Sequence, residues 1–116
     1  MVSMEKDERV AFRARTFEDF LGLVQEYHTA ERSLGFYAGR LGLPAKYLSK
    51  LVRSVSGRTA GSWIDSYVIE AAKKLLKYSE QPVASVAAQL NFSNETTFYR
   101  FFKAQTGMTP MEYRRG

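Results

Sequence analysis

Two stretches of seven residues decide the fold of this chain: AGRLGLP at residues 38–44 and AAQLNFS at residues 87–93. Each is followed by a shorter run with apolar positions, YLSKL at residues 47–51 or TFYRF at residues 97–101, and closes at Gly57 or Gly107. Each copy therefore has the layout helix, turn, helix. The copies are 49 residues apart at their start and 50 apart at their end, which predicts one residue inserted at the start of the second helix. Such a repeat predicts two similar supersecondary units in one small domain.

The turn of each copy carries a residue suited to a left-handed backbone. Gly42 adopts that conformation without steric cost, and Asn91 is the next-best residue for it. Pro44 suits the first turn of the helix that follows, because its missing N–H would have no partner there. In the second copy we predict that Ser93 caps the corresponding helix.

Apolar residues at helical spacing predict further helices on both sides of the repeat. We expect an all-α fold of about seven helices, in which two helix-turn-helix units are joined by a long central helix. Residues 1–8 are predicted to be a tail or linker remnant, and residues 9–116 a single domain with its units at about 33–57 and 82–107. The predicted helices span about residues 7–28, 34–41, 44–56 with Val55 facing inward, 59–78, 82–90 and 93–106, with a last one from the capping box at Thr109.

Composition excludes several classes of protein. The 116 residues include no cysteine and one histidine, so a disulfide framework and a thiolate metal site are excluded, and no metal site is expected. The amino-terminal residues lack the apolar run of a signal peptide, and no stretch is long enough to cross a membrane. We find no glycine-rich phosphate loop and no paired acids at a spacing that suits catalysis, so we expect neither an enzyme nor a cofactor. The formal net charge of +5 favours an anionic partner.

The second helix of a helix-turn-helix lies in the major groove of DNA, so its outer face must reach bases or phosphates. Lysine and arginine can donate to guanine, serine and threonine can serve any base, and a carboxylate can accept from cytosine. On the first copy we predict DNA contacts from Lys46, Ser49, Lys50 and Arg53. On the second we predict them from Asn94, Glu95, Thr96, Thr97, Arg100 and Lys103. The central helix of about 30 Å would act as a rigid spacer, close to the 34 Å of one DNA turn.

Several of these runs, in this order, resemble the DNA-binding domain of the AraC/XylS family of bacterial transcription regulators. The residues that carry the resemblance are Ala38–Leu43, Tyr47–Ser49, Gly57, Trp63–Ile64, Ala71–Leu76, and most of all the run from Val83 to Arg114. The resemblance implies that the two units bind adjacent major grooves, with Arg53 and Lys103 facing the backbone and the other predicted contacts, Asn94 apart, facing bases. Departures from the family pattern are Pro44, Asn91 and the bulky Tyr99.

The resemblance implies double-stranded DNA as the partner and the bacterial cytoplasm as the location, with the protein on the nucleoid through DNA binding. RNA polymerase is a further candidate partner, and no membrane is expected as one. Most family members carry an effector or dimerisation domain, so we expect such a domain to be missing from this chain. The alternative function is a helical protein–protein interaction module without sequence-specific DNA binding. Salt dependence separates the two, since a DNA reader that neutralises phosphates loses affinity steeply as salt rises.

Overall fold

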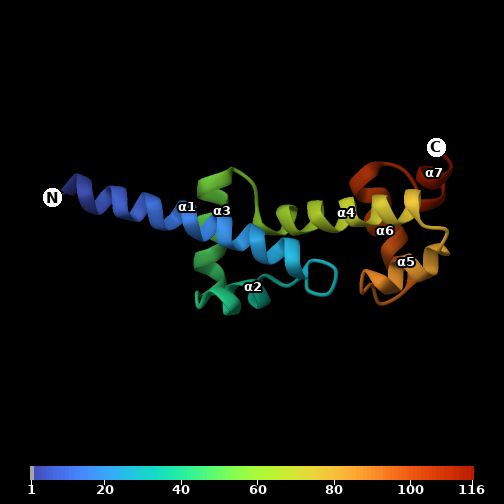
Figure 1. Cartoon of the computed structure of the whole chain (residues 1–116), viewed down its shortest axis with the longest axis horizontal. Helices are drawn as coiled ribbons and strands as arrows, with labels where there is room; N and C mark the ends of the chain where they lie inside the picture. The colour runs from blue at the N-terminus through green and yellow to red at the C-terminus, as the bar shows by residue number, and fades with distance from the viewer. Residues whose placement is uncertain (1) are drawn as a thin grey trace. The chain divides into compact units, whose positions relative to one another are not determined.

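Helices make up all of the regular secondary structure over residues 2–116, the part of the chain that the computed structural model describes (Figure 1). In chain order they are α1 (Val2–Tyr27), α2 (Leu34–Leu41), α3 (Ala45–Ser56), α4 (Ala60–Tyr78), α5 (Val83–Gln89), α6 (Glu95–Thr106) and α7 (Pro110–Arg115). The predicted all-α class and the seven helices are thus confirmed for these residues. None of the helices in this range is long and apolar enough to span a membrane.

The chain divides into two compact units that share α4. The first comprises Met1–His28 with Arg32–Asp65, and the second comprises Thr29–Glu31 with Ser66–Gly116. Each unit contains one copy of the sequence repeat, so each copy has a core of its own. The helix α4 begins in the first unit and ends in the second.

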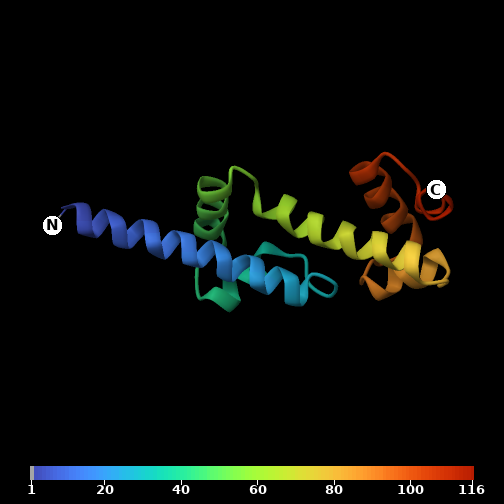
Figure 2. The ribbon, with the colours of Figure 1, turned by 45° about the horizontal axis from the view of Figure 1, so that its top comes forward.

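In the first unit, α1 crosses α3 and contacts both α2 and α3 (Figures 1 and 2). Phe20 of α1 packs edge-on against Tyr37 of α2, with the ring centroids 5.8 Å apart, and both side chains are fully buried. The remaining buried apolar residues of this core are Val24, Ala38, Leu48, Leu51, Val52, Ala60 and Ile64. Burial of this apolar surface fixes α3 through its apolar face and leaves its opposite face exposed to solvent.

In the second unit, α6 packs against α4 and α5 through phenylalanines. Phe98 and Phe102 are fully buried, and Phe92 in the turn contacts Phe98 at 5.2 Å and Phe101 at 5.3 Å between ring centroids. The buried members of this core are Ile69, Ala72, Leu76, Val86, Ala87, Leu90, Phe98 and Phe102. The phenylalanines, which the sequence places at helical spacing, are therefore core residues.

Three expectations from the sequence need correction. The helix α1 begins at Val2 rather than near Asp7, although the side chains from Glu5 to Phe12 are all exposed. The predicted tail boundary at residue 8 stays a prediction. Pro44 and Pro82 precede their helices as N-cap residues instead of opening them, because both have an extended backbone with ψ of 141° and 151°. Val55 does not face the core, since 40% of its surface is exposed.

Candidate nucleic-acid interface

The first helix-turn-helix unit consists of α2, a three-residue turn and α3. Ser33 caps α2, since its Oγ accepts a hydrogen bond from the backbone N–H of Phe36 at 3.1 Å. Gly42 ends α2 with φ of 68°, and the backbone N–H of Leu43 donates to the carbonyl of Ala38 at 2.9 Å. The left-handed conformation that the sequence predicts for Gly42 is confirmed. The turn thereby directs the chain from α2 into α3.

The second unit repeats this turn with asparagine in place of glycine. Asn91 has φ of 62°, and the backbone N–H of Phe92 donates to the carbonyl of Ala87 at 2.9 Å, as Leu43 does to Ala38. The left-handed conformation predicted for Asn91 is confirmed. Its side chain adds a contact, because Nδ2 donates to the backbone carbonyl of Ala30 at 2.8 Å.

The extra residue of the second copy lies in the turn and not at the start of the helix. Equivalent residues are 49 apart as far as Leu43 and Phe92, and 50 apart from the N-caps Pro44 and Asn94 onward. The second helix of each unit, α3 or α6, has 12 residues, and we call these two the reading helices because the sequence predicts that they read DNA. Every residue of α3 therefore corresponds to the residue of α6 that is 50 positions later in the sequence.

The N-cap of α6 is Asn94 and not Ser93, which corrects the prediction. The Oδ1 atom of Asn94 accepts hydrogen bonds from the backbone N–H of Thr97 at 2.7 Å and from its hydroxyl at 2.9 Å. Serine and asparagine are both good caps, so residue type alone could not distinguish two neighbours. The DNA contacts predicted for Asn94 and Thr97 stay predictions. Both side chains also take part in the hydrogen bonds that cap α6.

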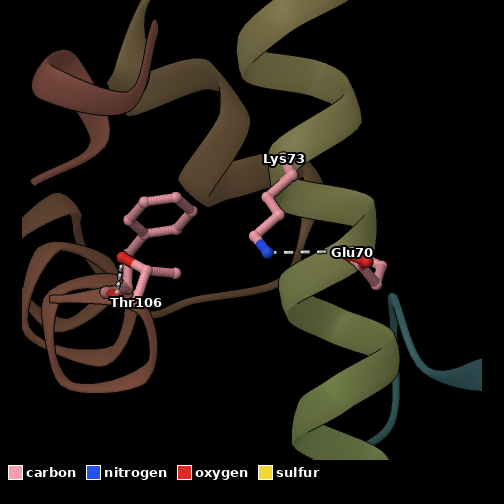
Figure 3. Close-up of polar contacts among 4 residues, drawn as sticks. Glu70, Lys73 and Thr106 are labelled. Carbon is pink, nitrogen blue, oxygen red and sulfur yellow. Dashed lines mark hydrogen bonds and ion pairs between the residues drawn. The ribbon is translucent and has the colours of Figure 1, made fainter. Parts of the chain in front are cut away.

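The two reading helices also end alike. The Ser56 hydroxyl donates to the carbonyl of Val52 at 2.7 Å, and the Thr106 hydroxyl donates to the carbonyl of Phe102 at 2.9 Å, one of the contacts drawn in Figure 3. The glycines that follow, Gly57 and Gly107, have φ of 78° and 79°. These matched ends confirm the offset of 50 along the whole length of both helices.

The outer face of α3 carries the four residues predicted from the sequence. Lys46, Ser49, Lys50 and Arg53 are all exposed. They lie three, four or seven positions apart and therefore share one face of the helix. The opposite face holds the buried Leu48, Leu51 and Val52. The face of α3 that the core leaves free is thus positively charged and rich in hydrogen-bond donors.

The exposed residues of α6 include Glu95, Thr96, Thr97, Tyr99, Arg100 and Lys103. The offset of 50 places two cations of α6 at the positions of two cations of α3: Arg100 corresponds to Lys50, and Lys103 corresponds to Arg53. Glu95 lies in the first turn, where a carboxylate is stabilised by the positive end of the helix dipole. That stabilisation gives Glu95 a structural role in addition to the base contact that was predicted.

One exposed residue of this face was not among the predicted contacts. Tyr99 corresponds to Ser49, and 42% of its surface is exposed. By the same register Thr97, which was predicted as a contact, corresponds to Tyr47. The signal that could have identified Tyr99 was in the repeat, because shifting Ser49 by 50 residues gives Tyr99 directly.

Other basic residues of the second unit lie on α4 and α7. Lys73 pairs with Glu70 one turn earlier on α4, with Nζ 3.7 Å from Oε2 (Figure 3). Arg114 of α7 donates from Nε to the carbonyl of Leu76 at 2.9 Å, near the end of α4 where backbone carbonyls lack helical partners. Arg114 thus has a structural role in joining α7 to α4.

Comparison with known proteins agrees with this geometry. A family of helix-turn-helix domains matches residues 37–116. The regulatory protein SoxS of Escherichia coli K12 is 26% identical over 100 residues, which cover 86% of this chain and 94% of SoxS. Among solved structures, the carboxy-terminal domain of the two-component response regulator yesN from Fusobacterium nucleatum superposes with a TM-score of 0.79 and is 26% identical, covering 84% of this chain and 95% of that chain.

A third similar structure was solved with DNA. The DNA-binding domain of AdpA, described as a global transcriptional factor in complex with a target DNA, has a TM-score of 0.76 and 21% identity, covering 85% of this chain and 89% of that chain. This similarity concerns the fold. Taken with the match over residues 37–116, it places both repeats within one known architecture. The chain belongs to the AraC/XylS-type family of helix-turn-helix domains, whose members are DNA-binding transcription regulators and not enzymes.

Proposed function

We propose that α3 and α6 each enter a major groove of double-stranded DNA, and that the two grooves are successive on the duplex. The observation that carries the proposal is the matched pair of cations on the exposed faces, Lys50 with Arg100 and Arg53 with Lys103. Two helices of equal length, each ending at a left-handed glycine, present these charges at the same positions along the helix. A repeated cationic face of this kind suits a repeated polyanion such as the DNA backbone.

Each face combines groups for base edges with groups for phosphates. We propose that Lys46, Ser49 and Lys50 of α3 contact bases, and that Glu95, Thr96, Thr97 and Arg100 do so on α6. Arg100 makes the most base-specific of these proposed contacts because a guanidinium can bind guanine O6 and N7 with two hydrogen bonds. Arg53 and Lys103, farther along their helices, would hold phosphates, and Asn94 would contact the backbone beside the start of α6.

Two further observations support this proposal: the length of α4 and a solved DNA complex. The helix α4 has 19 residues, which corresponds to a length of about 28 Å. One turn of B-DNA is about 34 Å, so a helix of this length suits two contacts one turn apart. The DNA complex of the related AdpA domain supports the same type of partner for this chain.

The experiment is a selection from a random pool of double-stranded DNA, followed by titration of the recovered sites at several salt concentrations. We expect the selected DNA to contain two short conserved sequences, here called boxes, about 10 base pairs apart. The slope of log K against log salt should be about −0.9 per phosphate contact. Salt-sensitive binding without a motif would contradict sequence-specific reading. Absence of binding at low salt would favour the alternative, a protein–protein interaction module.

The resemblance also suggests partners that this experiment does not address. We propose RNA polymerase as a protein partner of the DNA-bound chain and a separate effector or dimerisation domain as its regulator. Binding to chromosomal DNA would place the protein on the nucleoid. A pull-down of polymerase subunits in the presence and absence of the selected DNA site would test the first of these partners.

A further inference from the structure

The register between the two reading helices gives Tyr99 a position on the DNA-facing side of α6. Tyr99 corresponds to Ser49, which is one of the four exposed residues of the α3 face. On α6 it lies three residues after Thr96 and four before Lys103, so the three side chains share one face. Tyr99 as a whole residue is 42% exposed, whereas the neighbouring Phe98 is fully buried.

Tyr99 is not part of the hydrophobic core of the second unit. The buried cluster of the second unit takes Phe98 and Phe102 from α6, with Phe101 packed against it. A large aromatic ring held at a helix surface keeps apolar area in water, which costs free energy until a partner covers it. The matched position on α3 carries a serine, whose hydroxyl has no comparable apolar surface.

We infer that Tyr99 is a specificity-determining residue whose ring contacts the 5-methyl group of one thymine in the box read by α6. This inference rests on the proposed function, since it requires α6 to lie in a major groove. In that groove the 5-methyl group is the apolar feature that identifies thymine, and aromatic or methyl side chains recognise it by contact. The corresponding position in the box read by α3 lacks this preference, because Ser49 offers only a hydroxyl.

The experiment removes single methyl groups from the DNA. In the site selected by the wild-type chain, each thymine of the α6 box is replaced in turn by uracil, which keeps the base pairing and loses only the 5-methyl group. Affinities are measured for the wild type, Tyr99→Phe, Tyr99→Ala and the control Tyr47→Ala. Tyr47 is a matched control because it is 43% exposed on the other reading helix, at the register of Thr97.

We expect one uracil substitution to weaken wild-type binding about fourfold, the effect of one buried methyl group. Tyr99→Phe and Tyr47→Ala keep that ratio, whereas Tyr99→Ala binds the thymine and uracil sites equally. The ratio of two affinities for one variant does not depend on how much of that variant is folded. An unchanged ratio in Tyr99→Ala, or loss of the ratio in Tyr99→Phe, would overturn the inference. Wild-type protein that binds no DNA would instead overturn the proposed function.

Discussion

Asn94 holds the first turn of α6, because its Oδ1 accepts hydrogen bonds from both the backbone N–H and the hydroxyl of Thr97. Ser93 precedes it and is the one extra residue of the second turn. The start of the second reading helix therefore depends on the asparagine and not on the serine.

Replacement of Asn94 by alanine should lower the free energy of unfolding by about 1 kcal/mol, because the Thr97 N–H loses its partner. Ser93→Ala is the matched control and should change stability by less than about 0.5 kcal/mol, as exposed substitutions usually do. Urea unfolding followed by circular dichroism measures both. Equal losses in the two variants would contradict the assignment of the cap.

Gly42→Ala should destabilise the chain by about 1–2 kcal/mol because a side chain is disfavoured at its φ of 68°. Nothing lies within 4 Å of the position that a Cβ would occupy there, so the cost is one of backbone conformation alone. Gly39→Ala, three residues earlier within α2, also meets no atom within 4 Å and should be stabilising by about 0.5–1 kcal/mol. The same chemical change thus has opposite signs at two neighbouring glycines, and thermal unfolding of both variants checks this.

Arg100→Ala should cost about 1–3 kcal/mol of binding free energy on the selected site and relax the preference at one base position. Arg100→Lys keeps the charge but loses the planar two-bond contact, so it should weaken the base preference while keeping the salt slope. Competition assays with all four base pairs at each position of the α6 box provide the readout. An unchanged base preference in Arg100→Ala would show that another side chain reads that position.

Arg53→Ala should weaken binding to all DNA sequences by a similar factor, since a phosphate contact carries no base information. The slope of log K against log salt should become shallower by about 1. Arg53→Lys, which preserves the charge, should leave the slope unchanged. If Arg53→Ala altered the selected motif instead, Arg53 would be a base contact and not a phosphate contact.

The capping box of α7 should make stability depend on pH. The carboxylate of Glu112 accepts a hydrogen bond from the backbone N–H of Thr109 at 2.8 Å, and this bond lowers the pKa of Glu112 below its usual value. A carboxyl group whose pKa is lower in the folded state stabilises the fold above its unfolded pKa of about 4.3 and loses that contribution as the pH falls through the folded pKa.

The variant Glu112→Gln isolates this contribution because its side chain can keep the hydrogen bond but does not titrate. We expect the wild type to lose stability relative to Glu112→Gln as the pH falls below about 4, the range set by the unfolded pKa. Urea unfolding of both proteins between pH 2.5 and 6 gives the difference. A difference that stayed constant across this range would mean that the carboxylate is not stabilised by its cap.

Local chemistry predicted the turns well. Gly42 and Asn91 were identified as left-handed because few residue types tolerate that backbone, and Thr109 with Glu112 was identified as a capping box from its spacing. These features depend on residues within four positions of each other. For such features the sequence contains nearly all of the physical information that is needed.

Features that depend on the tertiary core were harder to predict. The helical spacing of Val55 matches that of the buried Leu48, Leu51 and Val52, yet Val55 is 40% exposed, and its counterpart in the second unit is the exposed Gln105. The cap at Asn94 depends on the longer turn that seats Phe92 between Phe98 and Phe101. Neither result follows from residue type or periodicity taken within one copy.

The equal length of α3 and α6 makes the two helices interchangeable in principle. Side chains 45, 46, 47, 49, 50 and 53 occupy the same sites on one helix as 95, 96, 97, 99, 100 and 103 occupy on the other. A variant in which these two sets are exchanged keeps both hydrophobic faces, both turns and the total charge. On the proposed function, such a protein would bind an operator whose two boxes are written in reversed order. The base contacts of the domain could then be rearranged between the two helices without changing the hydrophobic core.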